Sequence, residues 1–220
     1  MKNVLITRSP SASAEIAQLL ANQEFQIFCE PLFTVEKLAV EKVFTPISAA
    51  IVTSLNACLA LENSGISKKT KILTVGKKTA QELERIGFKN IILSPQNSAE
   101  SLFDLAAQES GQILYFRGSV ISFDFAAKLK NVRDILAYKT HEVENFSADF
   151  KKISYDEVLI FSKNSLEIFH KLITRHNLLE YFASSQILCL SDQILDCAKK
   201  FRFKKTCTFA DNPLLKKFYD

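Results

Sequence analysis

Short apolar runs alternate with segments of helical periodicity along almost the whole chain. Fully apolar runs of four or so residues are typical of parallel strands that are buried on both faces. The alternation therefore predicts an α/β fold, with parallel sheets covered by helices. The strands are expected at residues 4–6, 25–28, 50–52, 72–75, 91–93, 113–116, 132–138, 158–161, 187–190 and 206–209.

Helices are expected between these runs, where apolar residues recur every three or four positions. The first should begin at a cap, Ser11 or Ser13, and another should end at Gly87, since glycine favours the turn that closes a helix. The remaining helical segments are 56–61, 77–86, from 98, from 122, 166–173, 193–203 and from 213.

A faint internal repeat accompanies this pattern. Residues 51–57 (IVTSLNA) parallel residues 159–165 (LIFSKNS), and residues 94–98 (SPQNS) parallel residues 210–213 (ADNP). Two similar α/β domains would explain the repeat. Chance is the alternative, because Ser-x-Asn after a strand is also ordinary helix-capping chemistry.

The composition excludes several common sites. The five glycines are too far apart for a G-x-G-x-x-G dinucleotide loop or a Walker loop. The three histidines form no H-E-x-x-H motif, and the five cysteines form no C-x-x-C pair. We therefore expect a protein without metal or organic cofactor, whose thiols are reduced and mostly buried.

The sequence also predicts neither a transmembrane helix nor a secretory signal. It has no stretch of about 18 apolar residues, and residues 1–10 lack the cleavage site of a secretory signal. We expect a cytoplasmic protein. Its net charge of +4 is spread along the chain without a recognition motif, so no nucleic-acid partner is expected; a positive surface can equally steer a small polyanion.

Polar residues follow five of the expected strands. Each group combines a hydroxyl or a guanidinium with a helix start, and helix starts offer free N–H groups to anions. On one rim of a sheet, these groups would form a site for a ligand with several carboxylates or phosphates; the alternative is that the hydroxyls only cap helices. The groups are residues 7–8, 53–54, 76–79, 117–119 and 162–164.

Arg8, Arg117 and Tyr138 are the most specific candidates. A capping role does not call for arginine, and a guanidinium can pair with a ligand carboxylate or, equally, with a carboxylate of the protein. Tyr138 could donate a hydrogen bond or a proton to a ligand, although alone it is also an ordinary strand aromatic.

Several motifs occur in the order found in one enzyme family. The segments V-L-I-T-R with Pro10, Pro31-Leu32, I-V-T-S-L-N-A, T-V-G-K-K-T-A, S-A-E-S-L, I-L-Y-F-R-G and Y-K-T together resemble uroporphyrinogen-III synthases. The resemblance spans nearly the whole chain. It implies two α/β domains on a two-strand hinge, with a cleft between them: residues 1–35 plus 141–220 in one and 36–140 in the other.

The resemblance also implies a reaction. Hydroxymethylbilane loses its hydroxyl and closes to uroporphyrinogen III, with the last pyrrole inverted through a spiro intermediate. Family members need no cofactor, and a monomer with transient contact to the preceding pathway enzyme is expected. Tyr138 matches the family tyrosine that helps the hydroxyl leave. The residues expected to bind the substrate's carboxylates are Arg8, Ser54, Gly76, Lys78, Thr79, Arg117, Ser162 and Asn164.

One segment departs from the family. The second domain usually carries another G-x-x-T-A-like block, where this chain has S-D-Q-I-L at 191–195. Asp192 would repel a polycarboxylate unless it faces away or caps its helix. This departure favours an alternative function, a non-catalytic two-domain protein that binds a polyanionic, tetrapyrrole-like ligand.

Overall fold

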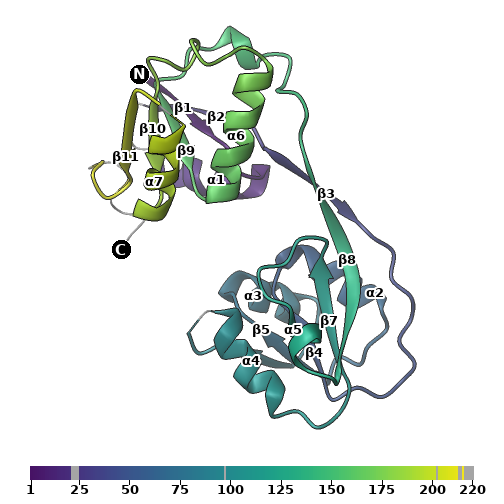
Figure 1. Cartoon of the computed structure of the whole chain (residues 1–220). Coiled ribbons are helices and arrows are strands. Elements are labelled where there is room, and N and C mark those ends of the chain that lie inside the picture. The colour runs from purple at the N-terminus through teal and green to yellow at the C-terminus, as the bar shows by residue number, and fades with distance from the viewer. Residues whose placement is uncertain (21–24, 97, 202, 213–214, 216–220) are drawn as a thin grey trace. The chain divides into compact units, whose positions relative to one another are not determined.

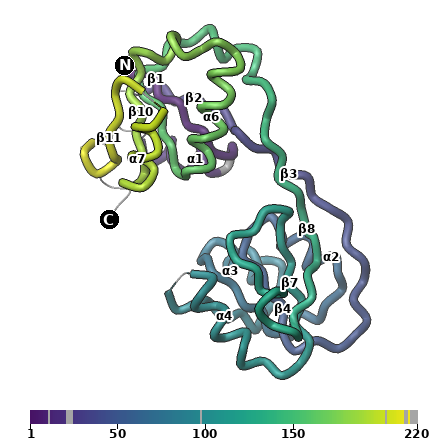
Figure 2. Tube along the Cα trace, viewed as in Figure 1, coloured from purple at the N-terminus to yellow at the C-terminus, as the bar shows by residue number. Residues whose placement is uncertain are grey.

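The computed structural model describes residues 1–20, 25–96, 98–201, 203–212 and 215, and the chain forms two compact units (Figure 1). Unit 1 comprises Met1–Thr34 and Glu142–Asp220, and unit 2 comprises Val35–His141. The chain passes between them twice, along β3 (Phe33–Lys37) and β8 (Val132–Glu142) (Figure 2). Unit 1 is therefore discontinuous in sequence.

The sheet of unit 1 consists of five parallel strands in the order β11-β10-β9-β1-β2. Helices cover both faces, because strands such as β9 are buried along their whole length. Helices α6 and α7 pack on one face around Phe169, and α1 packs on the other around Ile6. The elements are β1 (Lys2–Ile6), α1 (Pro10–Leu20), β2 (Phe25–Cys29), η2 (Phe150–Lys152), β9 (Glu157–Ile160), α6 (Lys163–Arg175), β10 (Gln186–Cys189), α7 (Asp192–Lys200) and β11 (Lys205–Thr208).

The sheet of unit 2 has the order β3-β8-β7-β4-β5-β6. Strands β4 to β8 run parallel. Helices α2 and α3 cover one face around Phe116, and α4 and α5 cover the other around Phe125. The elements besides β3 and β8 are β4 (Ala49–Val52), η1 (Leu55–Ala57), α2 (Cys58–Asn63), β5 (Lys71–Thr74), α3 (Lys77–Arg85), β6 (Asn90–Leu93), α4 (Ala99–Ala107), β7 (Ile113–Gly118) and α5 (Phe125–Lys128).

The two sheets share one spatial order of strands, related by a circular permutation of the chain. Read from β8, unit 2 has the order β8-β7-β4-β5-β6, and unit 1 has β2-β1-β9-β10-β11. Strand β9 thus takes in unit 1 the place that β4 takes in unit 2, which aligns residues 159–165 with residues 51–57. Similarly, β11 corresponds to β6, which aligns the segments that follow these two strands. The internal repeat therefore coincides with a structural repeat.

Two of the helices expected from the sequence begin elsewhere in the structure, and a third cannot be compared. Helix α1 begins at Pro10, before both serines proposed as its cap; proline suits a first helical position because its missing N–H would have no partner there. No long helix starts at Ser122: the chain forms only the short α5, capped by Asp124, whose carboxylate accepts from the amide of Ala127. The helix expected from Pro213 lies outside the described residues.

Candidate active site

A cavity of about 360 Å³ lies at the carboxyl ends of β4, β5 and β7 in unit 2. The connections from β4 lead to β5 on one side, whereas β7 lies on its other side, so the chain order reverses between β4 and β7. Ligands of open α/β sheets bind at such a reversal. We call this the switch-point cavity; it is lined by Thr53, Ser54, Val75, Ala99, Tyr115, Gly118, Val120, Ile121, Ser122, Phe123 and Tyr138.

Tyr138 lines this cavity from β8, the strand beside β7. It is partly exposed, and its ring packs against Gly118, the last residue of β7. The phenol is thus a hydroxyl donor that a ligand can reach at the end of the sheet.

Tyr115 is a second tyrosine in the same wall, and the sequence interpretation did not single it out. Its side chain is 4% exposed, and its hydroxyl lies 3.4 Å from the hydroxyl of Thr53. Burial raises the pKa of Tyr115, so its phenol stays protonated at neutral pH. A tyrosine inside an otherwise apolar buried strand was an available signal, because its hydroxyl must reach a polar partner.

The other unit 2 candidates lie at helix starts beside the cavity. Ser54 lines it, but its hydroxyl already accepts from the amide of Asn56 at 3.3 Å, as the capping alternative expects. Gly76 follows the cavity residue Val75 and caps α3 without a side chain. Thr79 is buried in the first turn of α3, and Lys78 is exposed there. This helix start offers backbone N–H groups, which favour anions.

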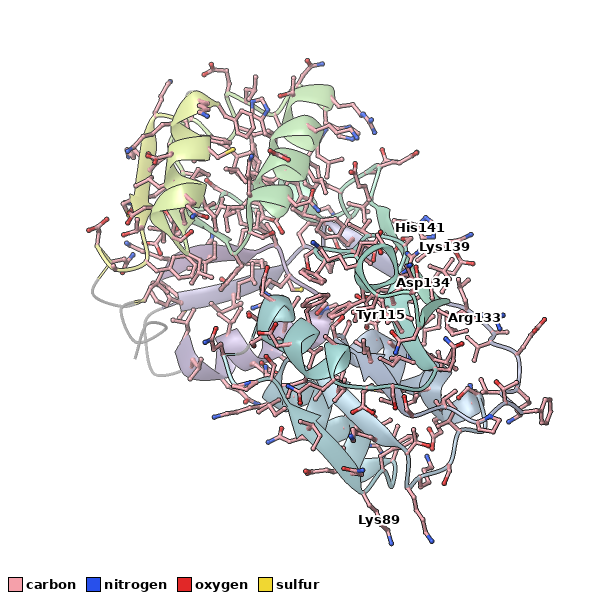
Figure 3. The ribbon with its side chains drawn as sticks, turned by 60° about the horizontal axis from the view of Figure 1, so that its bottom comes forward. Lys89, Tyr115, Arg133, Asp134, Lys139 and His141 are labelled. Atoms are coloured by element: carbon pink, nitrogen blue, oxygen red, sulfur yellow. The ribbon has the colours of Figure 1, made fainter. Side chains whose placement is uncertain are left out.

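Arg117 is engaged within the protein. Its Nε donates to Oδ2 of Asp134 at 2.5 Å, and its Nη1 donates to the carbonyl of Gly118 at 3.0 Å. Asp134 lies beside Tyr115 on the neighbouring strand (Figure 3). Of the two roles left open for Arg117, the structure shows the internal ion pair.

The unit 1 candidates gather at the corresponding reversal, between β1 and β9. Arg8 follows β1, is exposed, and holds its guanidinium 5.0 Å from the ring centre of Phe161, which follows β9. Ser162 accepts from the amide of Ser165 at 3.1 Å and so caps α6, whose first turn carries the exposed Asn164.

The sequence interpretation expected the five strand-end groups on one rim of a sheet. This expectation was wrong. Two lie at the sheet of unit 1 and three at the sheet of unit 2, because the alternating pattern continues through two separate sheets.

The departing segment 191–195 begins α7. Ser191 precedes this helix without a side-chain capping bond, and Asp192 is exposed in its first turn. A carboxylate there stabilises the helix through its dipole, which gives Asp192 a structural role.

The described residues contain no group of three or more His, Cys, Asp or Glu side chains that could hold a metal ion. Nor is any helix within the described ranges long and apolar enough to cross a membrane.

A family model for uroporphyrinogen-III synthase HemD matches residues 5–213. The chain belongs to this family. No curated protein sequence matches it significantly. Members of the family are enzymes of tetrapyrrole biosynthesis, so the chain has a small-molecule tetrapyrrole substrate, and its function is the cyclisation that gives uroporphyrinogen III.

Solved structures agree on the fold. Uroporphyrinogen-III synthetase from Helicobacter pylori 26695 is similar at a TM-score of 0.63 and 14% identity, over 100% of this chain and 98% of the other. A mutant uroporphyrinogen III synthase from the extremely thermophilic bacterium Thermus thermophilus is similar at 0.57 and 14%, over 100% and 96%. At these identities the likeness shows a common α/β architecture.

Proposed function

We propose that this chain is a carbon–oxygen lyase that converts hydroxymethylbilane to uroporphyrinogen III with loss of water, and that the switch-point cavity is where the hydroxyl leaves. The observation that supports it is the position of Tyr138: the residue that matches the family tyrosine lines a cavity at the chain reversal of the sheet. A phenol at this place can donate its proton to a departing hydroxyl.

The bond-making and bond-breaking steps need no other catalytic group than this acid. The nitrogen lone pair of the first pyrrole, which bears the hydroxymethyl group, expels the hydroxyl. The C–O bond breaks, and the oxygen leaves as water with the proton of Tyr138. The substituted carbon of the last ring attacks the resulting cation and forms the spiro intermediate. The bond from this carbon to the methylene bridge of the preceding pyrrole then breaks, and the free α-carbon of the inverted ring attacks that bridge and closes the macrocycle. The proton lost on closure returns to the Tyr138 phenolate, so the only net loss is water.

Holding the bilane in the folded geometry is the larger task, because orientation replaces an improbable encounter of two chain ends. We propose that the start of α3, with Gly76, Lys78 and Thr79, and the neighbouring Ser54 hold carboxylates of the substrate. A helix start stabilises an anion through its N–H groups and dipole. Arg8, Ser162 and Asn164 are proposed carboxylate contacts at the equivalent strand ends of unit 1.

Arg117 is left out of this set, since Asp134 already neutralises it. We further propose that the enzyme works without cofactor, as a monomer in the cytoplasm, and receives its unstable substrate through transient contact with the enzyme that makes it.

The direct test is an isomer assay. Purified protein is mixed with hydroxymethylbilane, the products are oxidised, and the type I and type III uroporphyrins are separated by chromatography. The proposal predicts type III as the main product, formed faster than type I appears without protein. Type I alone, at the spontaneous rate, would refute it, and tight binding of a uroporphyrin in the same preparation would then favour the binding-protein alternative.

A further inference from the structure

We propose that Gly118 is a positioning residue for Tyr138: the space left by its missing side chain holds the tyrosine ring at the switch-point cavity. The inference rests on the proposed role of Tyr138 and assigns a reason for the glycine that ends β7. It follows from three observations on the described residues: a close approach, a backbone conformation and a strand irregularity.

The close approach is steric. A Cβ atom built on Gly118 would lie 2.6 Å from both Cε2 and Cζ of Tyr138 and 2.8 Å from its hydroxyl oxygen. Carbon atoms in ordinary contact are about 3.5–4.0 Å apart, so even one methyl group would require the ring to move by roughly 1 Å. The atoms in conflict are the hydroxyl end of the ring, which carries the proposed acid.

The backbone does not by itself require glycine at this place. Gly65 and Gly87 adopt positive φ angles of 75° and 97°, where other residues are strained, but Gly118 is not among the glycines with positive φ. Alanine can therefore adopt the local conformation of Gly118. What excludes a side chain here is the tyrosine ring.

The strand irregularity fixes the ring over this space. Arg117 pairs with Leu136, but Gly118 pairs with Tyr138, so Ala137 is an extra residue in β8 and forms a β-bulge. Such bulges re-aim side chains near active sites. The amide of Ser119 donates to the carbonyl of Tyr138 at 3.0 Å, and the hydroxyl of Ser119 accepts from the amide of Thr140 at 3.2 Å. These bonds hold the backbone of Tyr138 next to Gly118.

Gly118→Ala is thus expected to displace the phenol while β7 and β8 stay paired. A displacement of about 1 Å in a catalytic geometry can reduce a rate roughly 10²-fold. Gly111→Ala is the matched control: a Cβ there would also meet a side chain closely, Cβ of Ser48 at 2.9 Å, but Gly111 does not line the cavity.

The first measurement needs no substrate. The protein is labelled with 3-fluorotyrosine, and the ¹⁹F resonance of position 138 is assigned by its loss in Tyr138→Phe. We expect this resonance to shift in Gly118→Ala and to keep its position in Gly111→Ala. An unchanged resonance in Gly118→Ala would overturn the proposal.

The second measurement is kinetic. Gly118→Ala should lower kcat for type III formation roughly 10²-fold and leave KM within about threefold, and the double variant with Tyr138→Phe should be no slower than Tyr138→Phe alone. Losses that multiply in the double variant would overturn the proposal. A shifted resonance together with full activity of Tyr138→Phe would instead leave the positioning intact and refute the acid role of Tyr138.

A third variant covers the case in which Gly118→Ala folds poorly. Replacing Tyr138 by alanine in the Gly118→Ala background removes the ring that the methyl group meets. The urea midpoint of this double variant should equal that of Tyr138→Ala alone; a midpoint still lowered by Gly118→Ala would place the conflict elsewhere and overturn the proposal.

Discussion

Nε of Arg117 lies 2.5 Å from Oδ2 of Asp134, across the pair β7–β8. Both side chains are about three-quarters buried, with exposed fractions of 24% and 27%. The second carboxylate oxygen, Oδ1, is buried and has no hydrogen-bond partner among the described residues. The guanidinium therefore offsets most of the desolvation cost of the Asp134 carboxylate, which is partly removed from water. Its role is to stabilise the sheet.

This ion pair predicts a loss of stability in Arg117→Met. Asp134 would lose its compensating charge, and we expect the free energy of unfolding to fall by about 1–3 kcal/mol. Urea unfolding followed by circular dichroism measures it. KM for hydroxymethylbilane should stay within about threefold; a tenfold rise in KM with unchanged stability would show that Arg117 binds the substrate instead.

The Glu82–Arg85 pair on α3 provides the control. It also joins an arginine to a carboxylate, here that of a glutamate, but Arg85 is 71% exposed and the two residues are one helical turn apart. Surface pairs contribute little because water and salt screen them. Arg85→Met should therefore change the urea midpoint less than Arg117→Met does.

The fold could be predicted from the sequence where burial is complete. Strands β4 and β9 are buried at every position, and their apolar runs alone indicate parallel strands. Strand β3 gave no such signal, because four of its five residues are exposed and it pairs with β8 at the edge of the sheet. The assignment of the strands to two sheets depends on contacts far apart in sequence, which no local pattern contains.

The candidate site was predictable only where local sequence patterns indicate it. Residues after strands indicated the carboxyl ends of the sheets, and the resemblance indicated Tyr138. The partner of Arg117 could not be predicted, because Asp134 lies 17 residues away on another strand. The proximity of Gly118 and Tyr138 depends on a bulge, and a bulge is a feature of pairing between strands.

His170 predicts a pH dependence of stability. Its ring stacks on Phe201 with centres 4.1 Å apart, and burial lowers its pKa below the ordinary value of 6.5. The unfolded chain then binds a proton at His170 more readily than the folded chain does. The contribution of the neutral ring to the free energy of unfolding is therefore complete above pH 6.5, and it is lost as the pH falls through the range between the two pKa values.

Urea midpoints measured from about pH 7.5 down to about pH 5 test this contribution. The midpoint should fall with pH, and His170→Gln should reduce the slope, because the titrating ring is gone. Phe201→Leu should raise the pKa of His170 toward its ordinary value, which NMR titration of the imidazole would show. A slope that is the same with and without His170 would contradict the prediction.

The cysteines predict an order of chemical modification. Burial raises the pKa of Cys58 and of Cys189 to about 12, whereas Cys29 is exposed. At about pH 8 a thiol with a pKa near 12 is a thiolate in only about one molecule in ten thousand, and the thiolate is the reactive form. Iodoacetamide should therefore label Cys29 first, with mass spectrometry of peptides as the readout.

Unfolding provides the control for this order. In urea above the midpoint, Cys29, Cys58 and Cys189 should react at similar rates, because all become exposed. Labelling of Cys58 in the folded protein as fast as that of Cys29 would mean that the core beneath α2 opens readily, contrary to its packing.

The central claim is that the phenol of Tyr138 assists departure of the hydroxyl at the switch-point cavity, and Tyr138→Phe tests it most directly. Tyr115→Phe is the matched control, since it removes a hydroxyl from the same cavity wall. That hydroxyl is buried against Thr53. The measurement is the initial rate of type III uroporphyrinogen formation at saturating hydroxymethylbilane. We expect Tyr138→Phe to lose about 10²-fold or more in kcat and Tyr115→Phe to stay within about threefold of the wild type. Equal rates for Tyr138→Phe and the wild type would contradict the account.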